Sequence, residues 1–382
     1  MEMVITCMPG LGELMRRELI TLGITPGEGS AAALQAEMSL EQALTVCLWS
    51  RIAERVLVPI ASVEVGPHEA PVALAAAVSA DHLSKAPALN VHADHEAGVR
   101  GDSRVSGSVF ARSLAQPLPL SRETRGALCL RLLIGESRSR RFVDLCGEPL
   151  SRRGYRLQGG AAPLRETLAA AMLMAAEWQP DVESGQWPAL VDPFSGSGTL
   201  LIEAALLASR RAPGLLRHEF AFRHWSGFSE PLWVQLCEQA RAMVLVPQGL
   251  SLKGFDADDG VQRQARANAE RAGVANLIHF ERRELGQLRK RDFAVDGVLV
   301  TNPPWGERLE DKARAGWLMN ALAYLLANEA RGWTATVLGS DVEVLDRSGA
   351  ETLAQWKVLN GAVNGFIRRL RPVRRAPVRP LL

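Results

Sequence analysis

Residues 190–200 read Leu190-Val191-Asp192-Pro193-Phe194-Ser195-Gly196-Ser197-Gly198-Thr199-Leu200, an apolar strand that runs through a glycine-rich turn into a helix. Gly196 and Gly198 let the backbone turn tightly and approach a ligand without a Cβ atom in between. The free amides at the start of the helix then face that ligand. The glycine spacing differs from that of nicotinamide-binding turns, because the third glycine does not fit. We interpret the segment as a ligand loop; a glycine-rich turn without a ligand is the alternative.

On both sides of this loop the chain alternates between helix and strand patterns. We predict helices over 164–176, 199–209, 259–272 and 316–329, and strands over 189–192, 252–256, 277–281, 297–301 and 334–338. Such alternation is typical of a parallel, doubly wound sheet. Two late segments, 355–359 and 365–370, are joined by Asn360-Gly361, which predicts a closing hairpin. A mostly parallel sheet with a C-terminal antiparallel hairpin is the Rossmann-like arrangement of the common methyltransferase fold.

The N-terminal part follows another pattern. Strands are expected over 4–7, 55–65, 127–134 and 140–145, and helices over 11–22, 40–49 and 70–78. Because these elements do not alternate regularly, they predict an α+β module. Residues 90–119 are polar, Gly/Ser-rich and weakly periodic, so no element is assigned to them. Glycines at 154, 159 and 160 place a domain boundary near residues 155–162.

Composition sets the broad class of the protein. The chain has 382 residues, which fits two or three domains, and its 47% hydrophobic and 23% charged residues are a globular composition. The five cysteines form no CxxC pair and are odd in number, which favours a reduced protein without a zinc site or disulfides. No signal peptide or membrane-length apolar run is expected, so we predict a cytoplasmic protein without a metal.

A second loop follows the apolar strand at 297–301 and reads Thr301-Asn302-Pro303-Pro304-Trp305-Gly306-Glu307-Arg308. An exocyclic amine on a base is a poor nucleophile, because its lone pair is delocalised into the ring. The Asn302 side-chain oxygen and the Pro303 carbonyl can each accept one N–H, which turns that lone pair towards a methyl donor. Adjacent prolines stiffen the loop, and Trp305 offers a flat face for a base turned out of its stack. A tight surface turn is the alternative.

Acidic residues at strand ends suit a donor of this kind. Asp192 can bind the ammonium of a methionine group and favours a sulfonium nearby. Asp256, followed by Ala257, ends the next strand and can accept ribose hydroxyls, whereas Asp258 is the alternative helix cap. Glu284, followed by Leu285, can contact an adenine amino group; a solvated charge cluster is the alternative.

These motifs, in this order, resemble the THUMP-containing class I RNA methyltransferases, and within them the RlmL-type enzymes, which make N2-methylguanosine in 23S ribosomal RNA. The resemblance covers nearly the whole chain and is carried by CLWSRIAERVLVPI (47–60), LSRRGYR (150–156), APLRETLAAAM (162–172), LVDPFSGSGTLLIEAALLA (190–208), RAPGLLR (211–217), FDADDGVQRQARANAERAG (255–273) and TNPPWGERL (301–309). It implies S-adenosylmethionine as cofactor, held by the residues from Asp192 to Thr199 and by Asp256, with Glu284 near adenine and Thr167 in a covering helix. Residues 302–305 would form the catalytic loop.

The resemblance also implies a division into a ferredoxin-like segment (1–44), a THUMP-like RNA-binding domain (45–157) and a methyltransferase domain (158–382). Arginines gather between residues 122 and 156 and again after residue 367. We expect Arg152, Arg153 and Arg308 to contact RNA phosphates or bases; solvated faces are the alternative.

Together these patterns predict methylation of guanine N2 in large-subunit ribosomal RNA by direct in-line transfer. Three alternatives remain: the same chemistry on transfer RNA, N6-adenine methylation of DNA, and a non-catalytic RNA-binding assembly factor.

Overall fold

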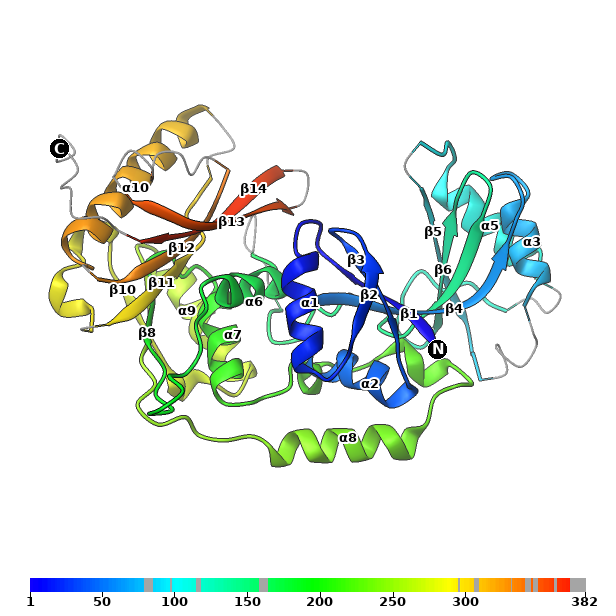
Figure 1. Ribbon diagram of the computed structural model, residues 1–382, viewed down its shortest axis with the longest axis horizontal. Helices are drawn as coiled ribbons and strands as arrows, with labels where there is room; N and C mark the ends of the chain where they lie inside the picture. Colours follow the sequence, from blue (N-terminus) through cyan, green and yellow to red (C-terminus); the bar gives the residue numbers. More distant parts are fainter. Residues whose placement is uncertain are drawn as a thin grey trace. The chain divides into compact units, whose positions relative to one another are not determined.

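The computed structural model describes residues 1–78, 85–96, 98–114, 118–157, 164–294, 296–305, 309–330, 332–340, 345, 350–360 and 363–371. The chain divides into two compact units, each built around its own sheet (Figure 1). The first unit comprises Met1–Cys7, Arg16–Arg152 and Arg217–Gln239, and the second comprises Met8–Met15, Arg153–Leu216 and Ala240–Leu382. The fold is α/β, with an α+β ferredoxin-like part followed by a Rossmann-like domain.

The sheet of the first unit has the strand order β2-β3-β1-β4-β7-β6-β5 and is antiparallel except for the β5–β6 pair. Its strands are β1 (Glu2–Cys7), β2 (Pro26–Gly29), β3 (Ala33–Glu37), β4 (Ala53–Val63), β5 (Leu89–His95), β6 (Leu128–Ile134) and β7 (Ser139–Asp144). The α-helices described between β1 and β7 are α1 (Gly12–Thr21), α2 (Leu40–Trp49), α3 (Ala70–Ala76) and α5 (Ser103–Arg112). The segments before and after residue 44 therefore contribute strands to one sheet. The predicted domain boundary between residues 44 and 45 stays a prediction.

The stretch 90–119, to which the sequence assigned no element, contains most of β5 and all of α5. Asp102 caps α5, because its carboxylate accepts the backbone N–H groups of Arg104 and Val105. The buried face of α5 includes Ser106 and Gly107, and Gly107 packs against Val91 of β5. Small residues on this face allow close packing but carry no hydrophobic period, which explains why the helix is not visible in the sequence.

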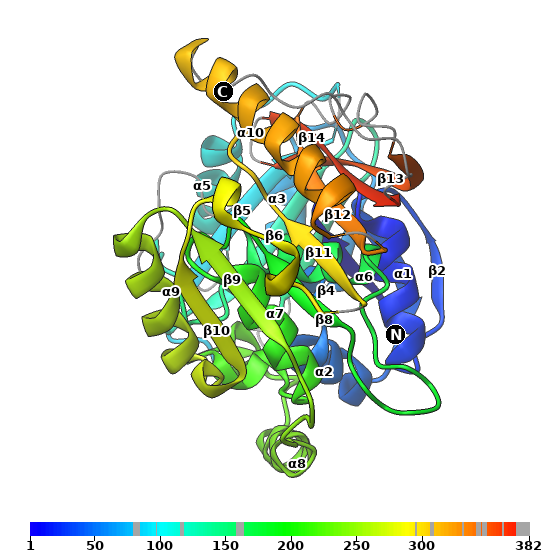
Figure 2. The same cartoon turned by 90° about the vertical axis from the view of Figure 1, so that its left-hand side faces the viewer.

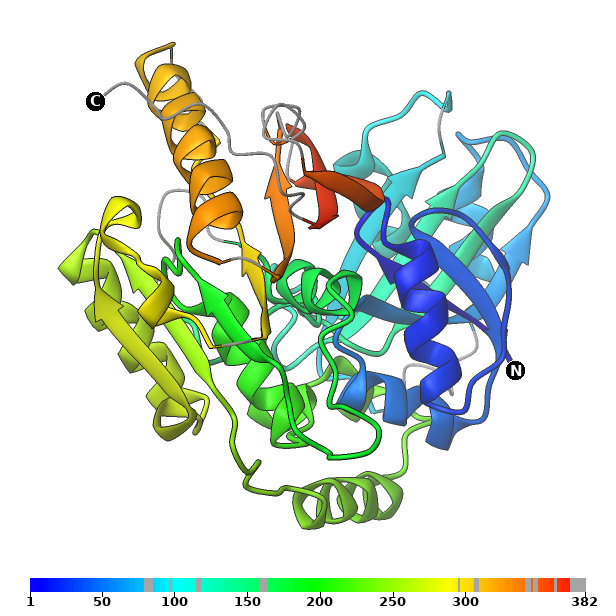
Figure 3. The same cartoon turned by 60° about the vertical axis from the view of Figure 1, so that its left-hand side comes forward.

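The sheet of the second unit has the strand order β10-β9-β8-β11-β12-β14-β13. It consists of β8 (Ala189–Asp192), β9 (Leu252–Asp256), β10 (Ile278–Arg282), β11 (Gly297–Thr301) and β12 (Thr334–Gly339), which are parallel, and of β13 (Glu351–Asn360) and β14 (Val363–Arg371), which form the antiparallel hairpin. Figure 2 shows the five parallel strands side by side, and Figure 3 shows the hairpin next to β12. The predicted sheet and its closing hairpin are confirmed.

Helices alternate with the strands along the chain, as predicted. They are α6 (Glu166–Ala175), α7 (Thr199–Ala208), α9 (Asp259–Arg271) and α10 (Leu309–Asn328); α8 (Glu230–Ala242) was not predicted. The start of α10 was predicted at residue 316, which is wrong, because its first turns are polar and lack an apolar period. Buried side chains of the strands and of α10, among them Phe255, Leu299 and Leu322, form the core that fixes the strand ends.

Three further observations concern the described residues. None of their helices is long and apolar enough to cross a bilayer. All five cysteines are free and buried. No group of His, Cys, Asp or Glu side chains in the described part of the chain is placed to hold a metal ion.

Candidate active site

The glycine-rich loop joins the end of β8 to the start of α7. Gly198 is the N-cap of α7 with φ +82°, and Gly196 has φ +50°, so both adopt the left-handed region that favours glycine. A Cβ atom on Gly198 would lie 2.8 Å from Phe280 Cζ and 3.1 Å from Ala265 Cβ. Glycine is thus required at 198 both for the backbone conformation and for the approach of neighbouring elements.

Two buried polar side chains of α9 hold this loop, and the sequence analysis missed both. Gln262 donates from Nε2 to Ser195 Oγ at 3.0 Å, and Asn268 donates from Nδ2 to the Ser197 carbonyl at 2.9 Å. Both side chains are 0% exposed. The available signal was the placement of two amides on the same face of α9 as the buried Ala265 and Ala269.

Asp192 ends β8 as a buried carboxyl group. Its Oδ1 accepts the Thr301 hydroxyl at 2.7 Å and the Phe194 backbone N–H at 3.1 Å. Burial, with a smaller contribution from nearby Asp256, raises the pKa of Asp192 to about 7 against the lowering effect of the two hydrogen bonds. No ion-pair partner of Asp192 lies among the described residues, so a cationic group would complete this site.

Asp256 ends the neighbouring strand β9 and contacts the same loop. Its Oδ2 accepts the Gly196 N–H at 3.1 Å, and its Oδ1 accepts the Asp258 N–H at 3.0 Å. Asp258 caps α9, since its side chain accepts the Val261 N–H at 3.1 Å. The structure therefore gives Asp258 the capping role and places Asp256 beside the loop, with Ala257 exposed next to it.

Glu284 and Leu285 follow the end of β10. Glu284 is exposed, and its carboxylate accepts the backbone N–H of Gln287 in a short capping box. Leu285 is 7% exposed and belongs to the core. Asp192, Asp256 and Glu284 thus follow three adjacent parallel strands, whose carboxyl ends share one edge of the sheet.

The Asn-Pro-Pro-Trp loop follows β11, which pairs in parallel with β8. Pro303 is buried, Pro304 is exposed, and Asn302 is partly buried. Trp305 donates from Nε1 to Asn302 Oδ1 at 2.9 Å. This loop and the glycine-rich loop follow neighbouring strands, and the Thr301–Asp192 hydrogen bond joins the ends of those strands. Arg308 lies outside the described residues.

Thr167 and Arg153 are buried in the second unit. Thr167 is 0% exposed in the first turn of α6. Arg153 is 1% exposed, and its Nε lies 3.6 Å from Glu203 Oε1. A guanidinium buried in this way does not reach RNA, so the expected substrate contact of Arg153 is corrected to a role in the fold. Arg152 is exposed, and its Nη1 lies 2.7 Å from Glu148 Oε2.

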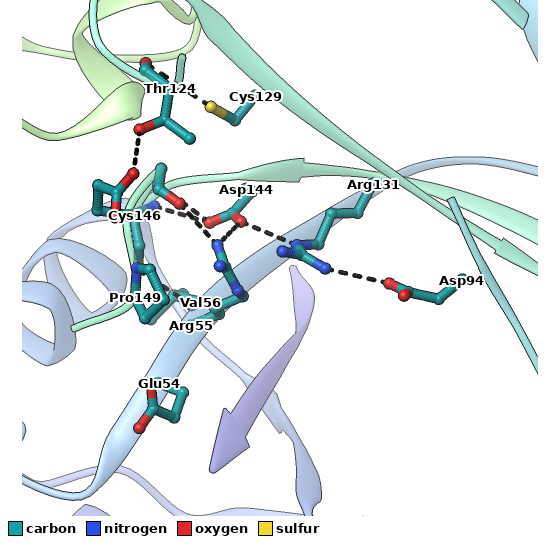
Figure 4. Close-up of polar contacts among 12 residues, drawn as sticks. Glu54, Arg55, Val56, Asp94, Thr124, Cys129, Arg131, Asp144, Cys146 and Pro149 are labelled. Carbon is teal, nitrogen blue, oxygen red and sulfur yellow. Dashed lines mark hydrogen bonds and ion pairs between the residues drawn. The ribbon is translucent and has the colours of Figure 1, made fainter. Parts of the chain in front are cut away.

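Other arginines of the expected RNA-binding cluster are also engaged within the protein. Across β5, β6, β7 and β4 runs a row of alternating charges formed by Asp94, Arg131, Asp144 and Arg55 (Figure 4). Arg131 lies 3.0 Å from both aspartates, and Asp144 also pairs with Arg55. Arg141 is 0% exposed and donates to the Leu74 carbonyl at 2.7 Å. Arg131 and Arg141 of the cluster, together with Arg55 outside it, are therefore engaged within the first unit.

Two protein families match the chain. Residues 153–369 match the family of "RMKL-like, methyltransferase domain", and residues 2–57 match the "RlmL ferredoxin-like domain". The first match covers more than half of the chain. The chain therefore belongs to this methyltransferase family.

Similar proteins share one name. The chain is 48% identical over 99% of its length to the ribosomal RNA large subunit methyltransferase K/L of Alcanivorax borkumensis. It is 35% identical over 95% of its length to the protein of the same name from Ectopseudomonas mendocina. Because it covers 53% and 51% of these two proteins, the chain spans about half the length of the curated relatives it matches.

A solved structure supports the fold. It is SMU.472, a putative methyltransferase complexed with SAH, which covers 98% of both chains with a TM-score of 0.83 and 24% sequence identity.

Proposed function

We propose that the chain is an S-adenosylmethionine-dependent methyltransferase that methylates the exocyclic N2 of a guanine in large-subunit (23S) ribosomal RNA. The observation that carries the proposal is the Thr301–Asp192 hydrogen bond, which joins the glycine-rich loop to the Asn-Pro-Pro-Trp loop. The names of the relatives, ribosomal RNA large subunit methyltransferase K/L, support RNA as the substrate.

The residues present fit the cofactor. Asp192 is a buried carboxyl without an ion-pair partner among the described residues, which suits an ammonium group. Gly196 and Gly198 place no side chain between their backbone and a ligand, and Asp256 keeps its carboxylate against the loop for ribose hydroxyls. Bound S-adenosylmethionine would supply an electrophilic methyl group on a positively charged sulfur.

Asn302 orients the nucleophile. An amide oxygen has two lone pairs, so Oδ1 can accept the Trp305 indole N–H and still accept one N–H of the base amine. The Pro303 carbonyl would accept the other N–H, and the stiff diproline keeps both acceptors in place. No strong general base is required, because the proton on nitrogen becomes acidic as the new bond forms. Trp305 would stack on the base, and Arg152 and Arg308 would contact the RNA backbone.

The test uses tritiated S-adenosylmethionine and the full chain. Undermodified ribosomal RNA, transfer RNA and DNA are incubated separately, and the labelled nucleosides are separated. Label in N2-methylguanosine from large-subunit ribosomal RNA is the expected result. Label only in transfer RNA or in N6-methyladenine of DNA contradicts the proposed substrate. Absence of S-adenosylmethionine binding in calorimetry would favour a non-catalytic assembly factor.

A further inference from the structure

The indole ring of Trp305 contacts a glycine of a distant strand. A Cβ atom built on Gly365 of β14 would lie 2.5 Å from Cη2 of Trp305, 3.2 Å from Cζ3 and 3.4 Å from Cζ2. Real side chains do not approach so closely, so any other residue at 365 would displace the ring. The same ring donates from Nε1 to Asn302 Oδ1 at 2.9 Å. The position of the donor therefore depends on the missing side chain of Gly365.

The backbone of Gly365 gives no other reason for glycine. It pairs in register with Val358 of β13 and is not among the glycines with positive φ. Glycine inside a strand is destabilising relative to alanine, and it often marks a close approach of another group. Here the approaching group is the Trp305 ring.

We propose that Gly365 and the Trp305 indole N–H form a positioning device for the Asn302 amide. This inference rests on the proposed function, because it specifies how the acceptor of that reaction is held. The indole N–H is only a donor. It stabilises the amide orientation with Oδ1 towards the ring, and it opposes the flipped orientation, in which two N–H groups would face each other. Gly365 acts through Trp305 and Trp305 acts through Asn302, so both are positioning residues in this role.

Stacking of the base and positioning of Asn302 predict different effects for Trp305→Phe. The phenyl ring keeps a flat face but has no N–H. We expect kcat to fall roughly fivefold with little change in the KM for RNA, since one neutral hydrogen bond contributes about 1 kcal/mol. Stacking alone predicts an unchanged kcat for this variant, and that result would overturn the inference.

Gly365→Ala tests the packing of the ring. We expect a similar loss of kcat in the otherwise unchanged protein and no further loss in a Trp305→Ala background, where no ring remains to be displaced. Gly316→Ala is the matched control, because a Cβ atom on Gly316 meets nothing within 4 Å. A Gly365→Ala loss that persists at full size in the Trp305→Ala background would show that Gly365 acts by another route. Melting temperatures identify variants that fail to fold.

A second measurement does not require methyl transfer. The indole N–H of Trp305 is assigned in an NMR spectrum of the full chain by its absence in Trp305→Phe. We expect it to exchange with solvent more slowly than that of Trp317, whose residue is 50% exposed. The exchange should accelerate in Asn302→Ala and Gly365→Ala but not in Gly316→Ala. Exchange in the wild type as fast as that of Trp317 would overturn the positioning role. Slow exchange in a protein that methylates no nucleic acid would contradict the proposed function and leave the device in place.

Discussion

Thr301 donates its hydroxyl to Asp192 Oδ1 at 2.7 Å, and both side chains are buried at the ends of adjacent parallel strands. The last residue of β11 thus holds the carboxyl group at the end of β8. The hydrogen bond favours the ionised form of Asp192, which burial disfavours. One contact therefore connects the charge of the candidate cofactor site with the position of the loop that would hold the substrate.

Removal of this hydroxyl should weaken cofactor binding. We expect Thr301→Val to reduce the affinity for S-adenosylhomocysteine roughly tenfold at pH 7, because it removes one hydrogen bond to a buried carboxylate. Isothermal titration calorimetry measures the change. Thr336→Val is the control: Thr336 is 0% exposed on β12, and its Oγ1 has no hydrogen-bond partner among the described residues. Equal losses in both variants would contradict a specific role of the Thr301 hydroxyl.

The affinity for the cofactor should depend on pH through Asp192. Its pKa is raised to about 7, so the carboxyl is mostly protonated below that pH and cannot pair with an ammonium group. We expect affinity to rise up to about tenfold per pH unit below pH 7 and to level off above it. Without ligand the sign is opposite: Asp192 contributes less to stability as pH rises from its ordinary value of 3.8 to about 7.

Two variants separate Asp192 from Glu166, a second buried carboxyl that titrates in this range. Asp192→Asn should bind the cofactor weakly and without this pH dependence. Burial also raises the pKa of Glu166 to about 7, but Glu166 pairs with Arg156 at 3.0 Å. Glu166→Gln should therefore keep the pH dependence. If the pH dependence of cofactor affinity disappears in Glu166→Gln, or persists in Asp192→Asn, a group other than Asp192 is responsible for it.

Asn302→Ala should reduce turnover with little effect on cofactor affinity. The Asn302 side-chain oxygen is expected to accept an N–H of the base amine. Loss of the orientation that this bond gives should lower kcat roughly a hundredfold. Single-turnover methyl transfer and calorimetry measure the two quantities. Asn276→Ala, at an exposed asparagine of the same unit, is the control. Parallel loss of turnover and cofactor affinity in Asn302→Ala would contradict the assigned role.

Asn268→Ala should weaken both the fold and the cofactor loop. It leaves the partly buried Ser197 carbonyl without its donor, which destabilises the protein by about 1–3 kcal/mol. Thermal unfolding with and without S-adenosylhomocysteine measures both effects. Arg263→Ala on the exposed face of the same helix removes only a surface ion pair with Asp259 and should change stability by less than about 1 kcal/mol. A loss in Asn268→Ala no larger than in Arg263→Ala would show that the loop does not depend on this contact.

The sequence predicted the second unit better than the first. The bounds of β8, β9 and β11 agree with the predicted segments 189–192, 252–256 and 297–301. Such strands are short apolar runs that end at polar residues, so both ends are visible. In the first unit β2, β3, β5 and α5 were missed. β2 and β3 are short, and α5 buries small residues. Pairing with neighbouring strands stabilises β2, β3 and β5 more than local preference does.

Some residues of the candidate site could also be predicted from the sequence, whereas others could not. Asp192, the glycines and Asn302 could be found from the sequence because each lies directly after a buried strand. The amides of Gln262 and Asn268 and the packing of Trp305 on Gly365 could not, because these contacts join segments that are distant in the chain. The burial of Arg153 was missed for the same reason, since its partner Glu203 lies on α7, far along the chain.

The row formed by Asp94, Arg131, Asp144 and Arg55 contains equal numbers of acidic and basic side chains in alternation. Its field cancels within a few ångströms, so this part of the sheet exerts little long-range attraction on a polyanion. Counterions released when the chain meets a nucleic acid would then come from contacts elsewhere on its surface. A salt dependence calculated from the number of arginines alone would therefore be steeper than the one expected for this chain.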